Sequence, residues 1–201
     1  MLPKKIFISF SILFLIIALS LTYCVSIQKS LSSKVLRLHI LANSNSTFDQ
    51  ELKLKVKDEI VNYLTPLLKD SKNLGETKKI IAENISEIKN IAKLVTNKYS
   101  NYNVKVSISN SNFPTKTYGN ISFPAGNYEA LKVEIGEAKG NNWWCVMFPP
   151  LCFTNSSAGV FDDDSNKKLK ETLSSSEYAM INNTNNPSVK IKFKLLELWN
   201  S

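Results

Sequence analysis

Hydrophobic residues are concentrated in one long block at the start of the chain and recur in shorter, periodic groups after it. The block covers residues 6–27, contains no charged side chain and directly follows Lys4 and Lys5. About 20 apolar residues suffice to cross the hydrocarbon core of a membrane, and a basic start before such a run is typical of an export signal. We therefore predict that residues 1–27 are a signal peptide or signal-anchor and that residues 28–201 form a single extracytoplasmic domain.

The apolar run leaves open whether the export segment is removed. Its small residues do not form a clean A-x-A cleavage pattern, and Tyr23 occupies the position where a lipobox has Gly or Ala. Cys24 is therefore expected to be an ordinary residue of the signal segment. If the segment is retained, Lys4 and Lys5 stay on the cytoplasmic side by the positive-inside rule, and residues 6–27 hold the chain in the membrane.

Two helical stretches follow, each marked by apolar residues that recur every three or four positions. The first begins at Thr47, which together with Gln50 fits a capping box. Its apolar face contains Leu52, Val56, Ile60 and Leu64. The second helix is predicted from about Glu76 to Tyr99, after Gly75. Its apolar face contains Ile81, Ile85, Ile88, Ala92 and Val95.

Alternation of apolar and polar residues predicts four strands. They are centred on residues 36–40, 104–108, 131–135 and 189–195, with turns around Pro114, Pro124 and Gly126 between the second and the third. Residues 162–187 are polar and weakly patterned, and we interpret them as partly loop, with a short helix near Leu169. The order of elements predicts an α+β fold: a two-layer domain whose mostly antiparallel sheet of about four strands carries two long helices on one face.

Charge excludes one class of function. The chain has 25 basic and 17 acidic residues, but Arg37 is its only arginine. Nucleic-acid readers depend on arginine for bidentate contacts to bases and phosphates, and the lysines here are scattered along the predicted helix faces. We therefore expect a solvated basic surface and no nucleic-acid partner.

The segment "NNWWCVMFPPLCF", residues 141–153, holds two of the three cysteines and two of the three tryptophans. Structural zinc sites need more closely spaced cysteines and further Cys or His ligands, whereas Cys145 and Cys152 have only His39 to add. A disulfide suits an exported protein. Closing the eight-residue loop between them would stabilise the fold by roughly 2.5 kcal/mol. We therefore predict a disulfide between Cys145 and Cys152 and no metal site.

An enzymatic alternative uses the same cysteines. Cys145 or Cys152 would be the nucleophile of an exported hydrolase, with His39 as its base and Asn43 or Asp162 orienting the histidine. Nucleophiles usually lie at a helix start or a glycine turn, and the residues beside Cys145 are bulky. The acidic "FDDDS" stretch lacks the ligand spacing and the glycine of a calcium loop. We therefore expect no catalytic residue and no cofactor.

The aromatic segment favours recognition over chemistry. A constrained loop cannot hide this many apolar side chains beneath itself, and aromatic anchors dominate binding hot spots. We predict that a partner binds Trp143, Trp144, Phe148, Pro149, Pro150 and Phe153.

Three stretches together resemble the stage II sporulation protein R family of endospore-forming Firmicutes. They are "LRLHILANSNSTFDQELKLKVKD", "FPTKTYGNISFPAGNYEALKVEIG" and "GNNWWCVMFPPLCF", and the resemblance runs in order from about Val35 to Trp199. The "NWWCV-x-FPPLCF" string is the most specific part. The chain departs from the family pattern at Asn45, where the family tends to have Asp. Residues 162–187 match no part of the family pattern, which implies a variable polar insert there.

The resemblance implies a signalling protein without enzymatic activity. Members of the family are made in the forespore and exported into the space between the forespore and mother-cell membranes. There they are needed to activate stage II sporulation protein GA, a membrane-embedded aspartic protease that removes the pro-sequence of sigma-E in the mother cell. A released protein and one anchored by residues 6–27 are both compatible with this role.

Overall fold

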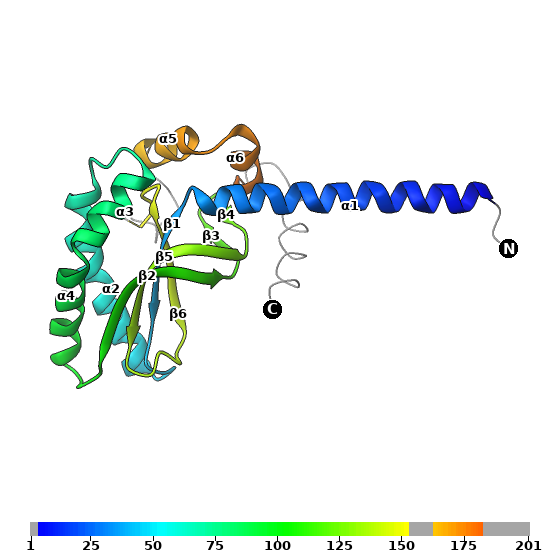
Figure 1. Ribbon diagram of the computed structural model, residues 1–201. Coiled ribbons are helices and arrows are strands. Elements are labelled where there is room, and N and C mark those ends of the chain that lie inside the picture. Colours follow the sequence, from blue (N-terminus) through cyan, green and yellow to red (C-terminus); the bar gives the residue numbers. More distant parts are fainter. Residues whose placement is uncertain (1–3, 153–162, 183–201) are drawn as a thin grey trace.

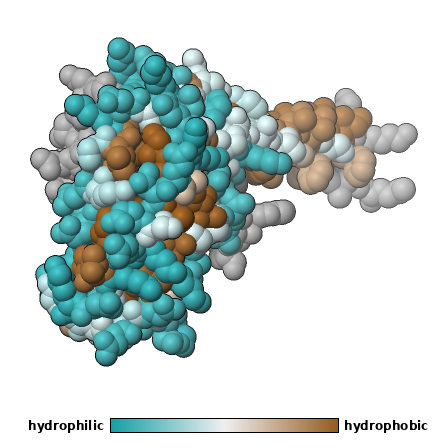
Figure 2. Space-filling model, turned by 60° about the vertical axis from the view of Figure 1, so that its left-hand side comes forward, coloured by the Kyte–Doolittle hydropathy of each residue, from teal (hydrophilic) through white to brown (hydrophobic). Residues whose placement is uncertain are grey.

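A long helix projects from one end of a two-layer α+β domain (Figure 1). The computed structural model describes residues 4–152 and 163–182. The projecting helix, α1, covers Lys4–Ser33, and residues Ile6–Ser33 are long and apolar enough to cross a membrane. Its apolar side chains are exposed along most of its length, and Figure 2 shows them as a rod that leaves a largely polar domain. The structure thus agrees with the predicted signal or anchor segment.

Within the described residues, the domain is built on one mixed sheet of four strands. Its strands are β1 (Leu36–Leu41), β2 (Val104–Phe113), β5 (Gly126–Ile135) and β6 (Asn142–Phe148), in the order β2-β5-β1-β6. β2–β5 and β1–β6 are antiparallel pairs, whereas β1–β5 is parallel. The α+β fold class is confirmed, and the sheet is mostly antiparallel with a parallel pair at its centre. The predicted strand at 189–195 lies outside the described residues.

In the part of the chain that the structure describes, three helices cover one face of the sheet, where the sequence predicted two (Figure 1). α2 spans Thr47–Leu68, α3 spans Leu74–Glu83 and α4 spans Ile85–Asn97. The predicted second helix is therefore interrupted at Asn84. The Asn84 backbone leaves the helical conformation, while its side chain donates to the carbonyl of Ile80 and accepts from the Tyr63 hydroxyl at 2.6 Å.

The start of α2 also differs from the prediction by one residue. Ser46 is the N-cap, and its hydroxyl accepts from the amide of Asp49. The predicted capping box of Thr47 and Gln50 is wrong, because the Gln50 side chain donates to the carbonyl of Ser44 instead. The rest of the helix follows its periodicity, and the predicted apolar face is buried.

Beneath the three helices lies the larger hydrophobic core. It joins the apolar faces of α2 and α4 to alternate residues of the sheet, among them Leu36, Leu38, Ile40, Leu131, Val133, Ile135 and Cys145. Because side chains alternate across a strand, the residues between these point to the opposite face.

A second core covers part of that opposite face. It is formed by the end of α1, the hairpin β3 (Lys116–Tyr118) and β4 (Ile121–Phe123), and the helices α5 (Asp163–Thr172) and α6 (Ser175–Ile181). The short helix predicted near Leu169 is confirmed as α5. Leu169, Leu173 and Ile181 are buried in this core, so part of the predicted polar insert belongs to the packed domain.

Candidate functional site

The tryptophan and cysteine segment is a strand for most of its length. Residues Asn142–Phe148 form β6 at one edge of the sheet, paired with β1. The prediction of a loop is wrong here, because apolar side chains point to both faces and hide the two-residue period of the strand. As a consequence, Trp143 and Trp144 lie on opposite faces of the sheet.

The structure contains the predicted disulfide. Cys145 is bonded to Cys152, with Cα atoms 5.7 Å apart. Between them the chain turns back at Pro149 and Pro150, and the amides of Leu151 and Cys152 both donate to the carbonyl of Val146. The bond therefore closes a turn at the end of β6.

Trp143 lies on the face of the sheet that carries the helices. It packs partly buried against the larger core, and the Lys57 amino group of α2 lies 4.8 Å from its ring centroid. This position at the sheet edge leaves part of the indole accessible beside a cation.

Trp144 lies on the other face, in a stack of rings. Its ring centroid is 3.9 Å from that of His39, with the two planes inclined by 20°, and 4.5 Å from that of Phe113. The side chain is partly exposed. Trp144 therefore covers His39 while keeping part of its own surface open to solvent.

His39 is a buried member of β1 and is only 5% exposed. Burial lowers its pKa to about 4, and the positive charge of Lys132 acts in the same direction, so the imidazole is neutral at pH 7. In the register of β1 and β6, His39 is opposite Trp144, whereas Cys145 is opposite Leu38. His39 and Cys145 consequently point to opposite faces of the sheet.

The alternative site of a cysteine hydrolase is therefore not formed. Its two thiols are joined in a disulfide, and its base lies across the sheet from Cys145. Asn43 does not orient His39, since its side chain accepts from the amide of Glu137 and donates to Asp49. Asp162 lies outside the described residues.

Arg37 was not singled out by the sequence analysis, yet it is completely buried. Its guanidinium carbon lies 4.1 Å from the ring centroid of Phe113 and 4.8 Å from that of Tyr128. It also donates to the Tyr118 hydroxyl, which donates in turn to the carbonyl of Trp144. Because the guanidinium lies over these rings, cation–π contacts contribute to its stabilisation.

The same hydroxyl helps to protect the edge of the sheet. An edge strand presents unpaired backbone groups to other chains. In β6 the carbonyl of Trp144 is bonded to Tyr118 and that of Val146 to the disulfide-closed turn. These two carbonyls of the edge are therefore not open to pairing with another strand.

A network of polar contacts connects the end of β1 to the start of β6. Asp49 is buried and accepts from Ser44 at 2.6 Å and from Asn43 at 2.9 Å. Burial alone would raise the pKa of this carboxyl group, but the hydrogen bonds from Ser44 and Asn43 outweigh it and lower the pKa. The "ANSNSTFDQ" motif is thus a structural turn.

Asn45 and Lys53 complete this connection. The Asn45 side-chain oxygen accepts from the amide of Asn141, and the Lys53 amino group donates to the Asn141 carbonyl at 2.9 Å. The role of Asn45 requires only an acceptor oxygen, which an aspartate at this position would also provide.

The predicted partner-binding residues have different environments. Trp143, Trp144 and Pro150 are partly exposed, whereas Phe148 and Pro149 are buried. Phe148 and Pro149 are therefore not exposed anchors, because the turn after β6 folds back onto the core. Phe153 lies outside the described residues.

Within the described residues, no group of three or more His, Cys, Asp or Glu side chains could hold a metal ion. Asp163 begins helix α5, and Phe161 and Asp162 of "FDDDS" lie outside the described residues.

Comparison with known proteins identifies the family. The model of the family described as stage II sporulation protein R (spore_II_R) matches residues 32–158. Stage II sporulation protein R of Bacillus subtilis (strain 168) is 40% identical over 146 residues, which cover 70% of this chain and 65% of that protein. The match thus spans slightly less than two thirds of the relative. No solved structure matches the chain.

The matched range begins at the end of α1 and includes the whole four-stranded sheet and the helices α2, α3 and α4 that cover it. It therefore contains the buried Arg37, the ring stack on His39 and both bonded cysteines. The chain belongs to the stage II sporulation protein R family.

Proposed function

We propose that this protein is an exported signal, made in the forespore, that activates stage II sporulation protein GA and so triggers removal of the pro-sequence of sigma-E in the mother cell. The observation that carries the proposal is a helix of membrane-spanning length joined directly to a disulfide-bonded domain of the protein R family. Disulfides persist in oxidising compartments and are rare in the cytosol.

The junction of helix and domain supports a position at the membrane surface. The 22 residues from Ile6 to Ile27 extend about 33 Å as a helix, enough to cross the hydrocarbon core. Leu31, one turn later, is completely buried in the second core, and the Ser30 hydroxyl donates to Glu177 at 2.6 Å. Almost no chain separates the membrane segment from the domain, which would face the space between the two membranes.

The chemistry of the domain favours binding over catalysis. Its two domain cysteines are cross-linked, and its single histidine is buried and neutral at pH 7. A protein with these features would activate the protease by contact. The partly exposed Trp143, beside the cation of Lys57, has the character of a binding anchor.

A complementation experiment tests the proposal. The chain would be expressed from a forespore promoter in a sporulating host that lacks its own protein R, and conversion of pro-sigma-E to sigma-E would be followed by immunoblot. We expect conversion with the full chain and none with a variant that lacks residues 1–27. Conversion by the unexported variant, or none by the full chain although it is folded and exported, would contradict the proposed function.

A further inference from the structure

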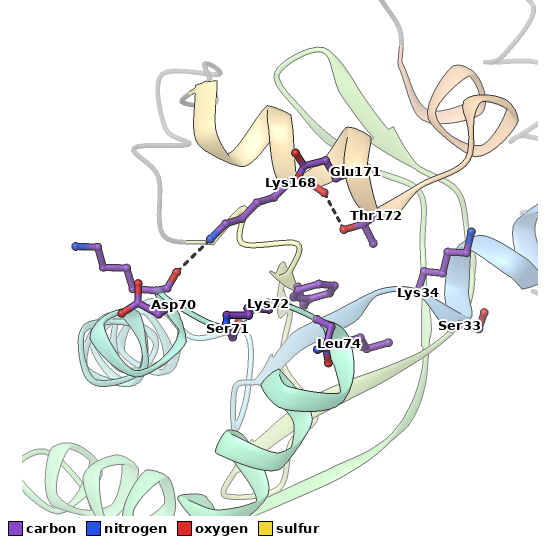
Figure 3. A pocket seen from close by; sticks show the side chains of 12 residues that line it. Ser33, Lys34, Asp70, Ser71, Lys72, Leu74, Lys168, Glu171 and Thr172 are labelled. Atoms are coloured by element: carbon purple, nitrogen blue, oxygen red, sulfur yellow. Dashed lines mark hydrogen bonds between the residues drawn. The ribbon is translucent and has the colours of Figure 1, made fainter.

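We propose that the cleft between the end of α1, the α2–α3 turn and α5 binds an acidic, extended segment of the protein partner. This inference rests on the proposed signalling function and assigns a surface to it. The cleft has a volume of about 680 Å³ (Figure 3). It is lined by Ser33 and Lys34, by Lys69 to Leu74, by Lys168, Glu171 and Thr172 of α5, and by Phe148.

The charge of the lining favours an anionic segment. The lining contains four lysines and only two carboxylates. The lysines are Lys34, Lys69, Lys72 and Lys168, and the carboxylates are those of Asp70 and Glu171. Lys34 is already paired with Glu177 at 2.7 Å, and Lys168 donates to the carbonyl of Lys69 at 3.1 Å. Figure 3 shows Lys168 reaching from α5 across to the end of α2.

Two of these ammonium groups remain available to a ligand. Lys69 and Lys72 are exposed, and neither side chain has an ion pair within the described parts of the chain. The adjacent start of α3 is already capped, because the Asn73 side chain accepts from the amide of Glu76 and the Glu76 carboxylate accepts from the amide of Lys72 at 2.8 Å. The α2–α3 turn thus supplies the two lysines of the cleft that are open to a ligand.

The floor of the cleft is apolar. Phe148 is the last residue of β6 and is 5% exposed, and Leu74 is partly buried beside it. The Cys145–Cys152 bond closes the turn behind Phe148 and so fixes the position of this ring. A preformed apolar floor reduces the ordering cost of binding. Phe148 therefore contributes to recognition at the base of a cleft, although it is not an exposed anchor.

The combination of exposed lysines and an apolar floor fits a peptide better than a phosphate group. Bidentate phosphate recognition relies on arginine, and the only arginine, Arg37, is buried among aromatic rings in the second core. Lysines on flexible stems around an apolar floor suit a chain that alternates carboxylates with apolar side chains. The occupant that this surface fits is therefore an acidic stretch of the proposed partner that also carries apolar side chains.

Charge reversal at the α2–α3 turn tests the inference in cells. The double variant Lys69→Glu/Lys72→Glu is compared with Lys89→Glu/Lys93→Glu, which reverses two exposed lysines on α4 away from the cleft. We expect the first variant to melt within about 2 °C of the wild type, since exposed charges add little stability, and to reduce pro-sigma-E conversion at least tenfold. The control should convert normally.

A binding measurement separates this inference from the proposed function. The full chain in detergent micelles is titrated with a fluorescent peptide of sequence DELDELDELD, and anisotropy is recorded. We expect the Lys69→Glu/Lys72→Glu variant to bind at least ten times more weakly than the wild type and the α4 control to bind equally well. The cleft is not the binding site if all three proteins bind the peptide equally well, or if the control is weakened as much as the Lys69→Glu/Lys72→Glu variant. Displacement of the peptide by millimolar inorganic phosphate or by anionic vesicles also overturns the proposed peptide specificity. Failure of the wild type to restore conversion overturns the function.

Discussion

Glu177 offers a test of how firmly the domain is attached to α1. This carboxylate of α6 is 2% exposed and accepts from the Lys34 amino group at 2.7 Å, the Ser30 hydroxyl at 2.6 Å and the Ser174 amide at 2.6 Å. Burial alone would raise its pKa, but the hydrogen bonds, led by the one from Lys34, outweigh burial and lower the pKa to about 2. Glu177 is therefore ionised throughout the physiological range.

The lowered pKa has a calculable effect on stability. The unfolded chain binds this proton at its ordinary pKa of 4.5 and the folded chain at a pKa of about 2. The stabilisation is therefore present in full above pH 4.5 and is lost as the pH falls toward 2. Because a tenfold difference in proton affinity between the two states is worth about 1.4 kcal/mol, the interaction contributes on the order of 3 kcal/mol at pH 7. Partial exposure of Lys34 reduces this to about 2 kcal/mol.

The variant Glu177→Gln keeps the shape of the side chain and removes its charge. We expect it to lower the free energy of unfolding by about 2 kcal/mol at pH 7 and to flatten the loss of stability between pH 5 and pH 2. Urea unfolding of the full chain in micelles, followed by tryptophan fluorescence at several pH values, measures both effects. The matched control is Glu83→Gln on the exposed surface of α3. If both variants unfold alike at pH 7, or if Glu177→Gln loses as much stability on acidification as the wild type, the reasoning is refuted.

Three further changes address β6 and its neighbours. Replacing either Cys145 or Cys152 with Ser should lower the free energy of unfolding by about 2 kcal/mol, because either change opens the same loop; melting curves that match the wild type would contradict this. Trp143→Ala should keep the melting temperature and weaken partner binding by about 2 kcal/mol, which would reduce pro-sigma-E conversion on an immunoblot. Trp144→Ala should instead lower the free energy of unfolding by about 3 kcal/mol through loss of the ring stack, which a thermal melt would show. His39→Phe should preserve the stack and leave conversion intact, and loss of conversion by this folded variant would disprove the non-catalytic role.

The local pattern of apolar and polar residues was sufficient to predict several elements of this protein. The length of the apolar run is sufficient to predict α1, because spanning a membrane depends on an uninterrupted stretch of sequence. The apolar face of α2 and the alternation in β1 likewise depend on near neighbours. The disulfide followed from the export segment and from the two cysteines that remain after Cys24, without knowledge of the fold.

Contacts between distant parts of the chain determined three features that the local sequence pattern could not predict. The long helix is interrupted at Asn84 because Tyr63, 21 residues earlier, bonds its side chain. β6 looked like a loop because its two faces are covered by different cores, which makes both sets of its side chains apolar. Arg37 alternates with leucines as a surface residue would, yet aromatic rings more than 70 residues later enclose it.

The proposed binding surface is the clearest product of the fold. Lys34, Lys72, Phe148 and Lys168 are scattered over more than 130 positions and have no shared pattern. They meet because α6 fixes the end of α1 through Glu177, and because α5 packs Leu169 into the second core beside the disulfide-closed turn. The sequence determines which segments are helix or strand, whereas the relative placement of segments depends on contacts between residues far apart in the chain.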